Sequence, residues 1–164
     1  MPPTRLLRSA EIPQADSLAN VRRVLEALSG GVDTREQIAE HTGISLRHVG
    51  YALAAARVLG WLGDDDASIT PAGRALLATP SGTADERALL RRAIFECDVV
   101  KQIAPDLFDP AAPTVVALAR RIFRLTAGLG KETARRRAQT LLAWRSQVLE
   151  QQLSLFPKRP RKQS

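Results

Sequence analysis

The stretch DTREQIAEHTGISLRHVGYALAAARVLGWL, from Asp33 to Leu62, decides the fold. Thr34 is a residue type that caps helices, and it predicts a short helix that runs to about His41. Gly43 then ends this helix in a turn, because glycine tolerates the left-handed conformation found after helix ends. The side of this helix that faces inward is predicted to hold Ile38 and Ala39.

A second helix is predicted directly after the turn. Ser45 can cap it, and Gly60 ends it. Two short helices joined by a three- or four-residue turn with glycine make a helix-turn-helix arrangement. The predicted buried residues recur at about 3.6 residues, the period of an α-helix, and are Val49, Leu53, Ala56 and Leu59. The predicted outer residues are Ser45, Arg47, His48, Tyr51 and Ala54.

The residues that follow extend this motif. The segment WLGDDDASIT, residues 61–70, has the pattern of a β-hairpin, and Pro71 suits the first turn of a further helix. The sequence IAEHTGISLRHVGYALAAARVLGWL followed by ITPAGRALL resembles a winged-helix domain, in which a β-hairpin (the wing) follows the recognition helix. The resemblance covers about residues 16–80.

A narrower resemblance rests on two separate runs. The run R-x-V-x-Y-A-x-x-A-A-x-x-L-G-W-L over 47–62 is similar to small winged-helix modules found beside bacterial restriction and AAA-type ATPase systems. The run TARRRAQTLLAW over 133–144 resembles a helix in the second half of the same modules. Together the two runs imply a DNA-engaging protein of a restriction or phage-defence system.

The rest of the chain predicts helices, so the expected fold class is all-α with a small β-wing. An N-terminal winged helix-turn-helix would be followed by a C-terminal three-helix, helix-turn-helix-like unit, with helices over about 83–103, 115–127 and 131–152. The expected boundaries are a flexible arm over 1–15, the winged helix over 16–80, the helical unit over 83–153 and a disordered basic tail over 154–164.

The charge is distributed unevenly over the 164 residues, whose net charge is +7. Residues 1–82 hold eight Arg against nine Asp and Glu, a net charge of −1. Residues 111–164 hold twelve Lys and Arg against two Glu, a net charge of +10. This asymmetry favours a polyanionic partner, and nucleic acid before a membrane, because no apolar face flanks the basic residues.

No pattern in the sequence predicts catalysis. His41 and His48 lie on different helices without Cys or carboxylates at metal-ligand spacing. Asp64–Asp66 fit a solvated turn better than a cation site, and Cys97 lies in an apolar helical stretch typical of a buried, inert thiol. We therefore expect no enzyme activity, no metal and no cofactor.

Two groups of residues are predicted to bind DNA. The recognition helix offers Ser45, Arg47, His48 and Tyr51 to base edges or phosphates, and Arg35 lies at the start of the preceding helix for a backbone contact. The alternative is a protein-interaction surface, because this half is not basic and an acidic wing tip would be repelled by phosphate. The second group is Arg120, Arg124, Lys131, Thr133, Arg135, Arg136 and Arg137.

The second group is expected to supply electrostatic affinity without sequence readout, together with Lys158, Arg159, Arg161 and Lys162 of the tail. The alternative is an ordinary solvated face. Since Arg135–Arg137 span about 200° of helix surface, at least one must point into the protein. We expect Arg136 or Arg137 to pair there with a carboxylate such as Asp98 or Asp106. Trp144 is expected in the core.

The sequence thus predicts a non-catalytic protein that binds double-stranded DNA with some influence of sequence. It would be a transcriptional regulator, which is usually a homodimer, or a DNA-engaging component of a bacterial restriction or phage-defence system. The alternative is a protein-interaction adaptor that docks on a larger ATPase or nuclease. The absence of a signal peptide and of a long apolar run predicts a cytoplasmic protein without membrane contact.

Overall fold

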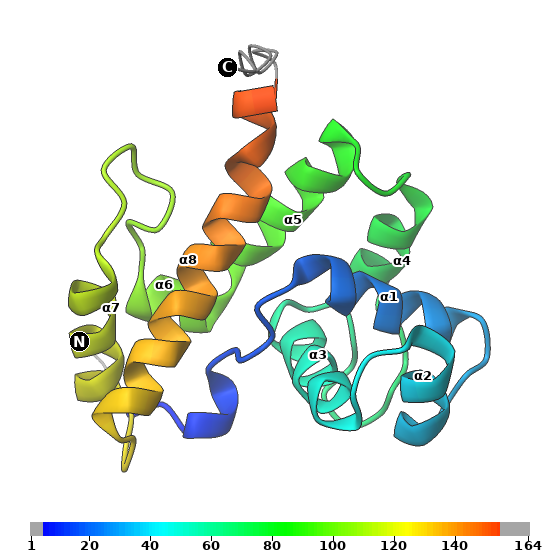
Figure 1. Cartoon of the computed structure of the whole chain (residues 1–164), viewed down its shortest axis with the longest axis horizontal. Helices are drawn as coiled ribbons and strands as arrows, with labels where there is room; N and C mark the ends of the chain where they lie inside the picture. The colour runs from blue at the N-terminus through cyan, green and yellow to red at the C-terminus, as the bar shows by residue number, and fades with distance from the viewer. Residues whose placement is uncertain (1–4, 155–164) are drawn as a thin grey trace, which may run out of the picture.

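The computed structural model describes residues 5–154, with side chains up to residue 149. Figure 1 shows one long helix, α8, that crosses the molecule, with α7 on one side of it and the α1–α3 group on the other. The predicted helical character is confirmed. The helices are η1 (Ser9–Glu11), α1 (Leu18–Ser29), α2 (Arg35–Thr42), α3 (Leu46–Val58), α4 (Pro71–Ala78), α5 (Ala84–Glu96), α6 (Asp98–Ile103), α7 (Val115–Leu125) and α8 (Lys131–Ser154).

The helix-turn-helix forms as its caps predict. The Thr34 hydroxyl accepts a hydrogen bond from the Gln37 amide at 3.1 Å, and Gly43 ends α2 with a φ of 74°. The Ser45 hydroxyl accepts from the His48 amide at 3.3 Å and so starts α3. These contacts satisfy amides that have no partner within the helix. The predicted inward residues of α3 are all buried: Val49, Leu53, Ala56 and Leu59.

The hairpin expected over 61–70 is reduced to a closed loop. Its one antiparallel bridge in the described chain joins Leu62 to Ile69, and the Gly63 amide donates to the Ser68 carbonyl at 2.9 Å. Asp66 accepts hydrogen bonds from the hydroxyl and the amide of Ser68, which lower the pKa of its carboxyl. The contacts between Asp66 and Ser68 therefore stabilise a tight turn, and this turn leaves no room for longer strands. Over the described residues 61–70 the expected wing consists of this one bridge and not of two extended strands.

Gly73 allows α4 to pack on this loop. A Cβ at residue 73 would lie 2.5 Å from the Trp61 carbonyl oxygen and 2.8 Å from Ile69 Cγ2. We expect Gly73→Ala to lower the free energy of unfolding by about 1–3 kcal/mol, because the clash outweighs the better helix propensity of alanine. Urea denaturation measures the change.

Gly50 is the matched control, because it also lies inside a helix. A Cβ there meets only Arg35 Nη1, at an ordinary 3.6 Å. Gly50→Ala is expected to stabilise the protein by up to about 1 kcal/mol. Equal effects of the two substitutions would show that the contact with Trp61 does not restrict residue 73.

The N-terminal segment is not a flexible arm from residue 5 onward, so that part of the expectation is wrong. Leu7 and Ile12 are buried, and the Leu7 amide donates to the Leu125 carbonyl at 2.7 Å while its own carbonyl accepts from Ala127 at 3.2 Å. This short parallel pairing satisfies backbone groups that an arm would leave to water. Residues 1–4 and 155–164, including the predicted basic tail, lie outside the described residues.

The helix expected over 83–103 is interrupted. Cys97 has extended backbone angles, with φ −65° and ψ 121°, and divides the segment into α5 and α6. The break lets Ile94 before it and Val100 after it both reach the core. The described C-terminal residues, 83–154, therefore form four helices where three were predicted. Cys97 is buried as predicted, and its burial raises the pKa of the thiol.

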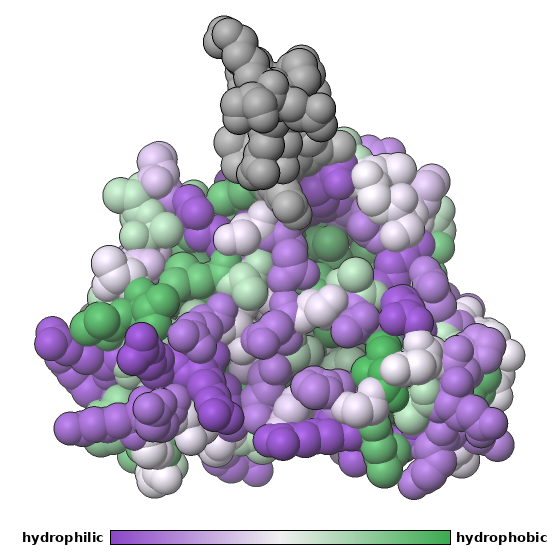
Figure 2. Space-filling model, viewed as in Figure 1, coloured by the Kyte–Doolittle hydropathy of each residue, from purple (hydrophilic) through white to green (hydrophobic). Residues whose placement is uncertain are grey.

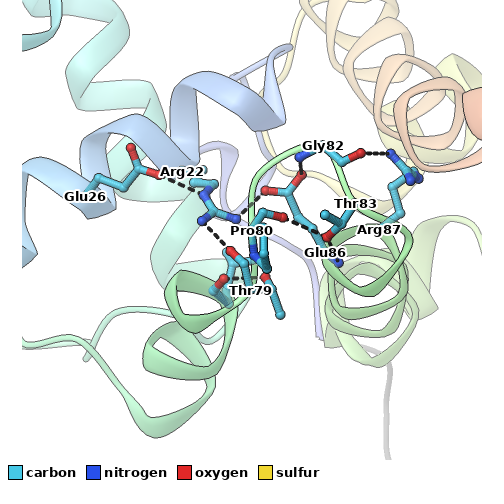
Figure 3. A network of polar contacts seen from close by, with 9 residues as sticks. Arg22, Glu26, Thr79, Pro80, Gly82, Thr83, Glu86 and Arg87 are labelled. Carbon is cyan, nitrogen blue, oxygen red and sulfur yellow. Dashed lines mark hydrogen bonds and ion pairs between the residues drawn. The ribbon is translucent and has the colours of Figure 1, made fainter.

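The segment Thr79–Gly82, which connects α4 to α5, is held in place by a buried ion pair (Figure 3). Arg22 of α1 donates to the Glu86 carboxylate of α5, and its other terminal nitrogen donates to the Thr79 carbonyl at 2.6 Å. Glu86 also accepts from the Gly82 amide at 3.0 Å. Although burial on its own lowers the pKa of Arg22, hydrogen bonds to Glu26 and Glu86 hold it above its ordinary value.

Helix α8 joins the two parts of the chain along one side. The Trp144 indole donates to the Ala15 carbonyl at 2.7 Å, and Gln147 bonds to the backbone of both Asp16 and Leu18. Trp144 is fully buried, as predicted, within a core that continues through both parts. The start of α1 is therefore fixed by the last helix of the chain. Among the described residues, none of the helices is long and apolar enough to cross a membrane.

Candidate nucleic-acid interface

The first turns of α3 present a compact polar cluster. Ser45, Arg47 and His48 are exposed, and Tyr51 is half-buried beneath them. Arg47 Nε donates to the Tyr51 hydroxyl oxygen at 2.6 Å, and Ser45 Oγ lies 2.6 Å from His48 Nδ1. The His48 ring meets the Tyr51 ring edge-on at a centroid distance of 5.7 Å. These contacts hold both side chains of the pair Arg47–His48 in place before any ligand arrives.

Arg35 lies on the flank of the same helix. It is the first residue of α2, it is exposed, and its guanidinium lies close to Gly50 of α3. A phosphate beside α3 would therefore be within reach of Arg35 and of the N-terminus of α2. The structure thus places Arg35 beside α3.

The outer side of α3 faces the first half of α8 across a hollow, here named the α3–α8 concavity. It has a volume of about 520 Å³. From α8 it receives Arg136, whose side chain is exposed, and Thr133. Its full lining is Gln14, Asp16, Arg47, His48, Tyr51, Thr133, Arg136, Arg137, Gln139 and Thr140.

Arg137 is the member of the Arg135–Arg137 run that points inward. It is 6% exposed, and it donates to the carbonyl oxygens of Ser9 at 2.9 Å and Ile12 at 2.8 Å. The expected carboxylate partner is wrong, because Asp106 instead forms a bidentate pair with Arg121 at 2.6 and 2.9 Å. Burial lowers the pKa of Arg137. Arg137 fixes the N-terminal segment and is not free to bind phosphate.

Two glutamines of the concavity were not predicted from the sequence. Gln139 follows Arg136 by three residues on α8, and this spacing places both on neighbouring parts of one face, so the helical period could have identified it. Gln14 lies on the segment that was expected to be flexible, and no sequence signal indicated it. The Asp16 carboxylate also lies here, where it accepts a hydrogen bond from the Thr140 hydroxyl at 2.5 Å.

The other predicted basic residues line a second hollow, the α7–α8 groove, of about 420 Å³. The groove lies on another side of α8. At 100° per residue, the direction of Lys131 and Arg135 is roughly 140° from that of Arg136 and Thr140. The groove is lined by Val115, Val116, Ala119, Arg120, Phe123, Arg124, Lys131, Ala134 and Arg135.

Figure 2 shows hydrophilic side chains along the lower part of the face that Figure 1 views, from α7 and the start of α8 across to the α2–α3 side. The linings of the two hollows divide between two surfaces the residues that the sequence presented as one basic group.

In the described part of the chain, no three His, Cys, Asp or Glu side chains are grouped to hold a metal ion.

Comparison with known proteins gives one match to part of the chain. A family model described as "wHTH-PRTase associated" matches residues 23–92, from α1 through most of α5. The chain contains a winged helix-turn-helix module. The match extends past residue 80, where the sequence resemblance ended, and includes Glu86, which ties α5 to α1. No curated protein matches the chain, and no solved structure does. A module of this kind indicates DNA binding in general.

Proposed function

We propose that this chain is a non-catalytic protein that binds double-stranded DNA through the first turns of α3. The observation that carries the proposal is the cluster Ser45–Arg47–His48, which is exposed at the N-terminal end of α3 while the opposite side of the helix is buried. Recognition helices contact base edges mainly with their N-terminal residues. In this proposal Arg47 would pair with guanine, and the exposed Arg35 and Arg136 would contact phosphates beside it.

The biological role proposed with this binding is transcriptional regulation or a DNA-engaging task in a bacterial restriction or phage-defence system. A regulator would act as a homodimer, since one recognition helix covers one half-site. A preference for one duplex sequence over random competitor supports the regulator. Binding without such a preference supports the defence component.

The salt dependence of duplex binding tests the proposal. We expect a gel shift at ~50 mM salt that weakens as salt rises, because phosphate contacts release counterions. Arg136→Ala should reduce the slope of log affinity against log salt by about one, for every sequence alike. Arg47→Ala should lose about 1–3 kcal/mol at the preferred sequence and less elsewhere.

Arg74→Ala is the control, because Arg74 is exposed on α4 outside the concavity. It should leave both the slope and the preference unchanged. The proposal fails if no duplex shifts at low salt, or if Arg74→Ala weakens binding as much as Arg47→Ala does.

A second candidate function is a protein-interaction adaptor, which two observations favour. The loop at 61–70 carries Asp64–Asp66 where many DNA-binding modules carry a basic wing, and the family description names a PRTase association. In that case the module would dock on a larger ATPase, nuclease or PRTase. This function would be favoured if the chain forms a stable complex with such a partner and does not bind duplex DNA.

A further inference from the structure

The α7–α8 groove has a composition that duplex DNA does not explain. Its floor is apolar and open: Val116 is 61% exposed and Phe123 is 44% exposed, and they lie seven residues apart on one side of α7. Exposed apolar side chains grouped in this way mark interaction sites, because leaving them in water is unfavourable. Phosphates of a duplex would contact the cations of the groove and leave these apolar side chains exposed to water.

The rim of the groove is uniformly basic. Arg120 and Arg124 border it from α7, and Lys131 and Arg135 border it from α8. All four are exposed, and among the described residues that line the groove none is acidic. By contrast, Arg121 of the same helix is neutralised by Asp106. The rim therefore presents four cations that pair with no carboxylate of the described residues, on either side of an apolar strip. The expectation that no apolar face flanks the basic residues is wrong for α7.

We propose that the α7–α8 groove binds an amphipathic helix of a partner protein, with an apolar face flanked by Asp or Glu. The apolar face would cover Val116 and Phe123, and the carboxylates would pair with the four rim cations. A helix laid in the groove between two connected helices is a common mode of peptide recognition. Two turns of helix, about 10 Å, match the spacing of Val116 and Phe123.

The charge of the rim favours an acidic helix of a partner protein over the basic C-terminal residues of the chain itself. The tail over 155–164 contains Lys158, Arg159, Arg161 and Lys162 and no acidic residue, so the rim would repel it. The site is independent of the proposed duplex contacts, because it lies on a different side of α8 from Arg136. The chain could then hold DNA on one side and a partner protein on the other.

The test uses the full chain and a synthetic probe. The probe is a fluorescent helical peptide of about four turns with Leu and Phe on one face and Glu on both flanks; its counterpart has Lys in place of Glu. Fluorescence polarisation should show that only the Glu peptide binds. Phe123→Asp, and separately the pair Arg120→Glu and Arg124→Glu, should weaken this binding at least about tenfold.

Two matched variants control for general effects. Phe95→Asp changes a Phe that is 59% exposed outside the groove, and Arg74→Glu reverses an exposed arginine on α4. Both should retain the affinity within about twofold. Circular dichroism of each variant verifies that it is folded, and the gel shift with duplex DNA is measured in parallel.

Several results would overturn the proposal. It is wrong if the Glu peptide does not bind, if the Lys peptide binds equally well, or if Phe123→Asp has no effect. The groove would be assigned to DNA if the Arg120→Glu and Arg124→Glu variant loses duplex binding and the unchanged chain does not bind the Glu peptide. A concentration-dependent dimer that Phe123→Asp dissolves, without peptide binding, would assign it to a second copy of the chain.

Discussion

Glu86→Ala is expected to lower the free energy of unfolding by about 3–5 kcal/mol, because it breaks a buried ion pair. Arg22 is 7% exposed and Glu86 is 8% exposed, and the carboxylate binds both the guanidinium and the Gly82 amide. Alanine leaves the buried guanidinium of Arg22 with the half-exposed Glu26 as its remaining carboxylate partner, and it leaves the Gly82 amide without its acceptor. Both losses are unfavourable because little water can reach these groups. Urea denaturation followed by circular dichroism measures the loss.

Glu96→Ala is the matched control for this prediction. Glu96 lies on the same helix and pairs with Arg92 at 3.2 Å, but both side chains are more than half exposed. Its removal should change the stability by no more than about 0.5 kcal/mol. If Glu86→Ala were as mild as Glu96→Ala, the Arg22–Glu86 pair would not hold α1 to α5.

Trp144→Ala is expected to lower the free energy of unfolding by about 3–5 kcal/mol, because it empties the centre of the contact between α8 and the N-terminal segment. Trp144→Phe should be milder. It keeps most of the volume and removes the hydrogen bond to Ala15, a loss of about 1–3 kcal/mol. The order of the two losses separates packing from hydrogen bonding.

The same residue tests whether the two parts unfold together. The chain has two tryptophans, Trp61 in the winged-helix module and Trp144 in α8. In Trp144→Phe only Trp61 reports, and in Trp61→Phe only Trp144 reports. Within each variant, fluorescence and circular dichroism should give one midpoint, because a continuous core joins both parts. Two separate transitions in either variant would show independent domains.

The helix-turn-helix could be predicted because its determinants are local. Thr34 and Ser45 bond to amides three residues ahead, and Gly43 takes a positive φ, so neighbouring residues alone set these features. The buried side of α3 follows from the helical period in the same way. Tertiary contacts reinforce this arrangement and do not alter it.

The features that could not be predicted depend on residues far apart in the chain. Leu7 is buried because it pairs with the backbone of residues 125–127, and nothing near residue 7 indicates that partner. The break at Cys97 has no proline or glycine to mark it. Arg137 was expected to find a carboxylate, yet backbone carbonyls of the N-terminal segment took that place.

The candidate site shows the same division. The sequence named Arg47, His48 and Arg136 as candidates, and the structure brings them to one hollow. Helical periodicity separates Arg135 from Arg136. The sequence could not show that Arg136 faces α3 and that Arg135 faces α7, because these directions depend on how α8 packs against the rest of the protein. The charge count alone therefore merged two surfaces whose chemistry differs.

Photocrosslinking tests the central claim, that duplex DNA lies against α3 and not in the α7–α8 groove. The photoreactive residue p-benzoylphenylalanine replaces either His48 of α3 or Phe123 of the groove, both of which are exposed. Each variant is irradiated with a labelled duplex of about two helical turns at low salt. If duplex DNA lies against α3, residue 48 forms a crosslink and residue 123 forms none. A crosslink from residue 123 alone would contradict it.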